Sequence, residues 1–247
     1  MKGPRPPHDS QARRGPLDGA GKFRGQVTLD GPSGTGKSSV ARDVATRLGA
    51  AYLDTGAMYR AATVAVLDAG VDLDDVDGMA QAVAEAEIHI STSADAEVVT
   101  VDGTDVTGRI RGAEVTRAVS PVSAVPAVRR LLVQQQRDLV AAAEAVVVEG
   151  RDIGTVVLPD ATCKIYLTAA PEVRAERRAG QLGVTDPARI AHIAADLRRR
   201  DEYDSSRDDS PLRPAGDAII VDSTGLDREA VVERVLDLAR SAVGEPA

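Results

Sequence analysis

The amino-acid sequence predicts an α/β protein in which helices cover a five-stranded parallel β-sheet. Short runs rich in β-branched residues alternate with longer segments whose apolar residues recur at helical spacing, which is the order of strand–helix–strand units. These runs are almost continuously apolar, as expected of strands that are buried on both faces. A glycine-rich turn joins the first strand to the first helix. The length of 247 residues suits one domain with an inserted lobe.

The first half of the chain opens with a strand, a turn and a helix. A strand is predicted over 26–30, and a helix over 38–48 carries its apolar residues on one face. Gly49 is a natural stop for that helix because glycine readily adopts the left-handed conformation. A second strand is predicted over 51–54 and a second helix over 57–69, so the alternation continues.

The alternation breaks between residues 71 and 111. The later half of this segment, 87–106, alternates polar and apolar residues around Asp102-Gly103, a dipeptide typical of hairpin turns. We therefore predict a small antiparallel insert here.

The second half returns to the earlier order. The predicted strands are 146–149, 164–168 and 218–222. The predicted helices are 127–145, 171–179, 187–201 and 227–243. Each strand again lies between helices, which favours parallel pairing.

The first 24 residues differ in composition from the rest. They are rich in proline and glycine, carry a net charge of +4 and show no apolar periodicity. Such a segment buries too little apolar surface to fold, so we predict a disordered tail over 1–24 and a folded domain over 25–247. The tail also lacks the apolar core of a secretory signal.

Composition excludes several functional classes. The whole chain has a net charge of −8 and few aromatic residues, which argues against a protein that binds nucleic acid through basic patches or base stacking. No apolar run is long enough to span a membrane. The single cysteine, Cys163, suits a reducing, cytoplasmic compartment.

A phosphate-binding loop pattern, G-x-x-x-x-G-K-[ST], lies between the first predicted strand and helix. Glycines let successive backbone N–H groups point at phosphate oxygens, and the following helix adds its positive dipole end. We expect Lys37 to neutralise β- and γ-phosphate charge and the Ser38 hydroxyl to reach Mg²⁺. The candidate nucleotide-binding residues are Gly31, Pro32, Ser33, Gly34, Thr35, Gly36, Lys37, Ser38 and Ser39.

The loop alone does not choose between a GTPase, a motor ATPase and a small-molecule kinase. None of the four lysines lies in the Asn-Lys-x-Asp guanine-binding motif, which excludes a GTPase. The strand that ends in Glu149 is a poor match to the aspartate-terminated strand of motor ATPases. A kinase needs a second anion site and a cationic segment that closes over both.

Arginines supply those two features. Arg60 lies one turn into the second predicted helix, and Arg151 follows the strand that ends at Glu149, at the carboxyl edge where ligands collect in such sheets. A dense run of mixed charge extends over 198–207. Guanidinium groups suit phosphoryl oxygens because they donate two parallel hydrogen bonds.

Six segments carry a resemblance to a known family. They are DGPSGTGKSS at 30–39, LDTGAMYRA at 53–61, VDGTDVTGRIR at 101–111, SPVSAVPAVR at 120–129, EGRDIGTVVLPDA at 149–161 and RRDEYDSSR at 199–207. In their order and spacing the chain resembles the bacterial cytidylate kinases, which are nucleoside monophosphate kinases. The resemblance covers about 26–243. It implies a P-loop kinase fold with the insert at about 71–111 in the monophosphate-binding lobe and a helical lid at about 180–213.

The resemblance also implies phosphoryl transfer from ATP to CMP or dCMP, with Mg²⁺, by a monomer. The residues that would act in catalysis are Lys37, Arg151, Arg200 and Arg207. Those that would contact the acceptor are Thr55, Arg60, Ser120, Arg129, Arg151, Asp152, Arg200, Asp204 and Arg207.

Within that set the family implies separate tasks. The acceptor phosphate would be bound by Arg60, Arg151 and Arg207, and the cytosine edge by Ser120, Arg129 and Asp152. Asp204 would bind the ribose hydroxyls, oriented by Arg200. Thr55 stands where the family often has serine, and Pro121 could tilt the neighbouring Ser120 hydroxyl.

Several alternatives stay open at the level of sequence. Asp30 and Glu149 either order Mg²⁺-bound waters or are structural. The acceptor could be a non-nucleotide compound, the preferred pyrimidine could be CMP or UMP, and a non-catalytic ATP sensor would also use the loop. Such a sensor has no need of the arginine cluster.

Overall fold

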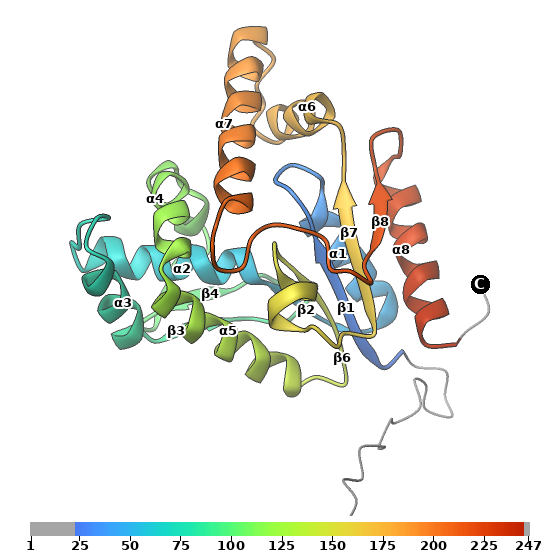
Figure 1. The fold of residues 1–247 in the computed structure, drawn as a ribbon, viewed down its shortest axis with the longest axis horizontal. Coiled ribbons are helices and arrows are strands. Elements are labelled where there is room, and N and C mark those ends of the chain that lie inside the picture. Colours follow the sequence, from blue (N-terminus) through green and yellow to red (C-terminus); the bar gives the residue numbers. More distant parts are fainter. Residues whose placement is uncertain (1–22, 245–247) are drawn as a thin grey trace, which may run out of the picture.

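The structure, a computed structural model, describes residues 23–244. Its centre is the predicted five-stranded parallel sheet, with strand order β2-β6-β1-β7-β8 (Figure 1). The strands are β1 (Gly25–Asp30), β2 (Ala51–Asp54), β6 (Ala145–Glu149), β7 (Cys163–Thr168) and β8 (Ile219–Asp222). The carboxyl ends of β1, β6 and β7 therefore meet at one edge of the sheet.

Helices cover both faces of this sheet. The helices are α1 (Lys37–Leu48), α2 (Thr55–Asp68), α3 (Val76–Glu85), α4 (Ala113–Ala124), α5 (Pro126–Ala141), α6 (Pro171–Gln181), α7 (Pro187–Ser205) and α8 (Arg228–Ala242). Of these, α1 and α8 pack on one face of the sheet, and α2 and α5 pack on the other. Two short turns complete the pattern, a 3₁₀ turn at Arg109–Arg111 and a π-helical turn at Ile153–Val157.

The core consists of two hydrophobic clusters, one on each face. Successive residues of β6 alternate between them: Val147 packs with α1 and α8, whereas Val146 and Val148 pack with α2 and α5. This alternation follows from the two-residue period of a strand. Burial on both faces explains why the central strands read as continuous apolar runs.

The insert contains the predicted antiparallel sheet. Its strands are β3 (Ile88–Ile90), β4 (Val99–Val101) and β5 (Thr104–Asp105). The loop between β3 and β4 reaches back to the main sheet, where the Tyr52 backbone N–H donates to the Thr92 carbonyl oxygen at 2.9 Å. The insert is thus attached to the edge of β2 as well as to α2.

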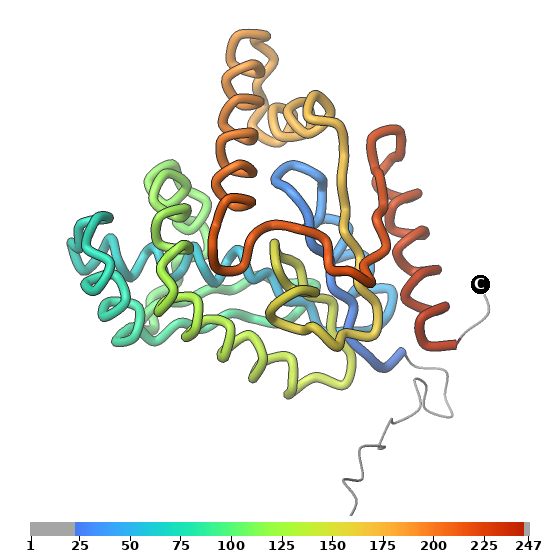
Figure 2. Tube along the Cα trace, in the orientation of Figure 1, coloured from blue at the N-terminus to red at the C-terminus, as the bar shows by residue number. Residues whose placement is uncertain are grey.

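Two helices, α6 and α7, project beyond the carboxyl edge of the sheet and are named the lid helices after the lid predicted at about 180–213 (Figure 1). The sequence predicts that the second helix ends at Asp201, but α7 continues to Ser205. The chain then crosses in front of the sheet edge from the base of α7 to β8 (Figure 2). The extra helical turn places Asp201 and Asp204, three residues apart, on neighbouring positions of one helix face.

Two helical predictions need correction. The helix predicted over 127–145 ends at Ala141, because residues from Ala145 onward pair with β1. The helix α3 was not predicted, nor was α4, which contains Pro121. That helix is stabilised by packing, because its buried side chains, among them Val115 and Val119, contact the cluster around α2.

Two burial predictions also fail. The strand β8 lies at the edge of the sheet, and Ile219 and Ile220 are exposed instead of buried on both faces. Phe23, assigned to the predicted tail, is buried in the cluster of α1 and α8. Residues 1–22 of that tail lie outside the described part of the chain.

Candidate active site

The phosphate-binding loop follows β1 and runs into α1, as predicted. Gly31 has φ of 143°, and a Cβ there would lie 2.1 Å from the Leu167 carbonyl oxygen, so only glycine fits. Gly36 caps α1 in the left-handed conformation with φ of 91°. No described atom within 4 Å blocks a Cβ at Gly36, so this end of α1 faces open space in the site.

Lys37 is buried at the centre of the loop. Its Nζ donates to the Pro32 carbonyl oxygen at 2.7 Å and lies 3.4 Å from Thr35 Oγ1. Burial, and then the nearby charge of Arg151, lower the pKa of Lys37 to about 7. A bound anion would favour the charged ammonium, which is the form that a polyphosphate needs.

Ser38 and Glu149 form an oxygen-rich corner beside Lys37. The Ser38 hydroxyl donates to Glu149 Oε2 at 3.0 Å, and the Tyr52 hydroxyl donates to the other carboxylate oxygen. Burial, and then the nearby Asp54, raise the pKa of Glu149 to about 7. Hydroxyl and carboxylate oxygens are the donors that Mg²⁺ prefers, so this corner fits the metal that the sequence suggests.

Asp30 does not belong to that corner. Its carboxylate accepts hydrogen bonds from the backbone N–H groups of Ile153 at 2.8 Å and Gly154 at 2.7 Å. Burial is the main reason why its pKa is raised to about 6. Both oxygens are thus bound to the turn after β6, which favours the structural role over the metal role for Asp30.

Arg151 joins the loop to the lid. From the end of β6 its guanidinium donates to Ser33 Oγ at 2.6 Å, to the Gly31 carbonyl oxygen at 3.1 Å and to Asp204 Oδ2 at 3.0 Å. Arg151 therefore lies between the phosphate-binding loop and α7, at the predicted carboxyl edge of the sheet.

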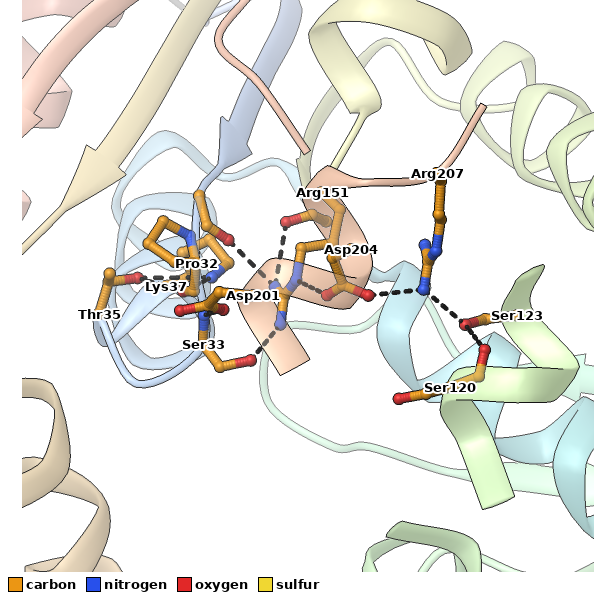
Figure 3. A network of polar contacts seen from close by, with 12 residues as sticks. Pro32, Ser33, Thr35, Lys37, Ser120, Ser123, Arg151, Asp201, Asp204 and Arg207 are labelled. Atoms are coloured by element: carbon orange, nitrogen blue, oxygen red, sulfur yellow. Dashed lines mark hydrogen bonds and ion pairs between the residues drawn. The ribbon is translucent and has the colours of Figure 1, made fainter. Parts of the chain in front are cut away.

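Asp204 is buried between two of the predicted arginines. It pairs with Arg151 on one side and with Arg207 on the other, and Arg207 also donates to Ser123 Oγ at 3.0 Å (Figure 3). Arg200, which the sequence suggests as the orienting residue, has no hydrogen-bond partner for its Nε within residues 23–244. The hydrogen bonds to the Asp204 side chain come from Arg151 and Arg207, and the positive charge of Arg200 also lies near this carboxylate.

Arg200 and Arg60 both lie among other positively charged side chains of the site. Burial, and then Arg151, lower the pKa of Arg200 to about 10, while burial and then Arg111 lower that of Arg60 to about 10. Arg60 donates to the Ile110 carbonyl oxygen at 2.8 Å and to Thr116 Oγ1 at 3.1 Å. This crowding of cations favours an anionic ligand between them.

The three predicted base-contacting residues lie around α4 and α5. Arg129 is buried in an ion pair with Asp152, stacks over the Tyr59 ring at 5.2 Å and donates to the Ser123 carbonyl oxygen at 3.2 Å. Ser120 lies in the middle of α4 and is partly buried. The structure thus brings Arg129 and Asp152 into direct contact.

The Thr55 hydroxyl is directed to the backbone at the end of β6. It donates to the Glu149 backbone carbonyl oxygen at 2.7 Å and is buried against Gly150. The side chain thus ties α2 to the end of β6. Among the described residues that line the cavity below, Thr55 is absent.

One cavity of about 870 Å³ connects these groups. The predicted residues that line it are Ser33, Gly34, Gly36, Lys37, Ser38, Ser39, Arg60, Ser120, Arg151 and Arg200. Asp204 adjoins it through its hydrogen bond with Arg151, and Arg207 is bonded to Asp204 in turn. Asp152 directly follows Arg151 in the chain and pairs with Arg129. The loop glycines and the arginines of the acceptor side therefore face the same space.

Several residues of the site were missed by the sequence reasoning. Arg111 and Arg178 line the cavity, and Asp201 accepts a hydrogen bond from the Ser33 backbone N–H at 3.0 Å while pairing with Arg174. The dense charge of 198–207 signalled the region of Asp201. No sequence pattern singled out Arg174, which lies in an ordinary amphipathic helix.

The family model and the similar known proteins point to the same family. Residues 27–241 match the family described as cytidylate kinase. A cytidylate kinase of Nocardia farcinica is 58% identical over 212 residues, covering 85% of this chain and 90% of the relative. A cytidylate kinase of Rhodococcus opacus is 56% identical over 222 residues, covering 89% and 97%.

A likeness to solved structures is weaker. A gluconokinase from Sinorhizobium meliloti 1021 is 18% identical with a TM-score of 0.48, covering 90% of this chain and 95% of that chain, and carries no argument on function. Within the described residues no helix has the length and apolar character needed to cross a membrane.

Proposed function

The chain belongs to the cytidylate kinase family, and from this premise we propose that it transfers the γ-phosphoryl group of ATP to the 5′-phosphate of CMP and dCMP. The observation that carries the proposal is that two cationic groups face one cavity. The phosphate-binding loop with Lys37 forms the first, and Arg60, Arg151 and Arg200 form the second. A reaction between two phosphates needs this arrangement.

On the donor side, the loop would hold the triphosphate. The backbone N–H groups at the start of α1 and the Lys37 ammonium would bind the β- and γ-phosphate oxygens. Lys37 would exchange its hydrogen bond to the Pro32 carbonyl oxygen for one to phosphate, and the anion would raise its lowered pKa.

The metal corner would be formed by Ser38, with Glu149 ordering metal-bound water. Mg²⁺ would neutralise charge on the phosphate oxygens when bound. This assignment rests on the oxygen donor set and on the 3.0 Å hydrogen bond between the two side chains.

On the acceptor side, Arg60, Arg151 and Arg207 would bind the monophosphate. The attacking phosphate oxygen is already ionised, so no strong general base is required, and we assign none to Asp152. The arginines would hold the acceptor in line with the γ-phosphate and offset the charge that spreads over the transferred group.

Ser120, Arg129 and Asp152 would bind the cytosine edge, and Asp204 the ribose hydroxyls. Arg129 and Asp152 are both buried and paired, so their geometry is set before the base arrives. The lid helices would then close on the two nucleotides and keep water away from the γ-phosphate.

A coupled assay of ADP release tests the proposal. With ATP and Mg²⁺, we expect turnover with CMP and dCMP well above that with UMP, AMP or GMP. Lys37→Ala should abolish turnover with every acceptor, whereas Arg130→Ala, at an exposed position of α5, should leave it unchanged. Equal background rates with all five monophosphates would overturn the proposal.

The same assay separates the two rivals. A kinase for a non-nucleotide acceptor would release ADP with a sugar or an organic acid and not with CMP. A non-catalytic sensor would bind ATP and turn over nothing. The arginine cluster opposite the loop favours a kinase over a sensor, because a sensor needs one anion site only.

A further inference from the structure

The turn after β6 carries two residues of the proposed acceptor site, Arg151 and Asp152. The π-helical turn that follows begins at Ile153, so Asp152 occupies its N-cap position. The first backbone N–H groups of a helical turn have no partner within the turn and need one from outside.

An aspartate at an N-cap position ordinarily supplies that partner with its own carboxylate. Asp152 makes no such capping hydrogen bond. Its carboxylate points instead to the guanidinium of Arg129, with which it forms a buried ion pair. The turn must therefore be capped by another group.

Asp30 supplies the missing cap from the end of β1. One of its carboxylate oxygens accepts from the Ile153 N–H at 2.8 Å and the other from the Gly154 N–H at 2.7 Å. Gly154 is packed against this carboxylate, since a Cβ there would lie 3.4 Å from Asp30 Oδ2 and 3.3 Å from both Thr28 Oγ1 and Lys164 Cδ.

We propose that Asp30 is a positioning residue for recognition of the monophosphate base: by capping the turn in place of Asp152, it leaves the Asp152 carboxylate available to Arg129 and to the substrate. Without Asp30, the uncapped N–H groups would compete with Arg129 for Asp152. The carboxylate would then turn toward its own backbone and away from the base. This inference rests on the proposed role of Asp152 in binding cytosine.

A double-mutant cycle tests this coupling. Asp30→Asn preserves shape but places an amide N–H₂ against one of the two backbone N–H groups. We expect CMP affinity, measured by calorimetry on the full chain, to fall about tenfold, as for the loss of one hydrogen bond to a charged group. In the Asp152→Asn background, the same change should alter CMP affinity by less than about twofold, because the side chain through which Asp30 acts is already impaired.

The control is Val27→Ala, on the same strand and fully buried. It should lower the melting temperature while leaving CMP affinity unchanged, which separates positioning from general destabilisation. ATP affinity is measured in the same experiments. Asp30→Asn should change it by the same factor with and without Asp152→Asn. If Asp30→Asn does not fold, Gly154→Ala is used instead, because it displaces the same turn by a few tenths of an ångström without changing charge. Its effect on CMP affinity should likewise disappear in the Asp152→Asn background.

Equal losses of CMP affinity in both backgrounds would overturn the inference, as would an Asp30→Asn protein that binds CMP normally. An Asp152→Asn protein with unchanged CMP affinity would overturn it too. Wild-type turnover of CMP tests the proposed function by itself, so the two failures are distinguishable.

Discussion

Buried charges dominate the site at the scale of single residues. Arg129 and Asp152 are each almost completely buried, and each depends on the other for compensation. Removal of one partner from such a pair leaves an uncompensated charge in a medium of low polarity. The pair is thus held together by the mutual compensation of its two charges.

Arg129→Ala should therefore affect both stability and recognition. We expect a loss of about 3–5 kcal/mol of unfolding free energy, as for breaking a buried ion pair, and a much larger loss of affinity for CMP than for ATP. Urea unfolding and calorimetry with each nucleotide measure the two effects. Arg130→Ala, the exposed neighbour, is the control, and equal losses for the two nucleotides would contradict a role in base recognition.

At the scale of elements, the end of α7 is fastened to the phosphate-binding loop through Ser33. The Ser33 N–H donates to Asp201, its carbonyl oxygen accepts from Arg174 at 3.1 Å, and its hydroxyl accepts from Arg151. Three elements thus contact one loop residue. Because Asp201 and Arg174 come from the two lid helices, the lid position is coupled to the shape of the loop.

Asp201→Asn should weaken this coupling. With the ion pair to Arg174 lost, we expect the lid to close less completely, so that kcat for CMP falls while ATP hydrolysis without acceptor rises, because water reaches the γ-phosphate. Glu202→Gln makes the same charge change at the adjacent exposed position and should leave both rates as in the wild type. A fall in kcat without extra hydrolysis would place the effect elsewhere.

At the scale of the whole molecule, the site sits at an edge between two apolar clusters. The site residues at the carboxyl ends of the central strands border the cavity. The neighbouring apolar clusters shield their charged groups from water. Burial raises the pKa of Glu149 to about 7 and lowers that of Lys37 to about 7. Both pKa shifts reflect the unfavourable free energy of burying a charged group in a preformed site.

The pH dependence of stability follows from Glu149. The folded state binds the Glu149 proton more tightly than the unfolded state, in which the pKa of this carboxyl group is near its ordinary value of 4.5. The contribution of Glu149 to stability is therefore present at low pH and is lost as pH rises from about 4.5 to about 7. We expect Glu149→Gln to gain stability relative to the wild type between pH 5 and pH 8, measured by thermal unfolding. Glu176→Gln is the exposed control, and a constant difference across pH would contradict this assignment.

Most of the sheet and most of the phosphate-binding loop were predictable from sequence. The strands are short apolar runs, and the loop pattern is local, so the prediction needs no tertiary contact. The helix α4 was not predictable in this way, because Pro121 argues against a helix and only packing of its buried face on α2 stabilises it. The exposed Ile219 and Ile220 illustrate the same limit, since edge position depends on strand order.

The α/β class, the phosphate-binding loop with Lys37 and the family follow from local patterns along the chain. The partners of the charged side chains depend instead on contacts between distant parts of the chain. Asp30 binds the turn after β6, Thr55 binds a backbone oxygen, and Asp204 lies between Arg151 and Arg207. The physical reason is that a buried carboxylate or hydroxyl takes whichever partner the fold brings within hydrogen-bond distance, and that choice depends on residues far apart in the sequence.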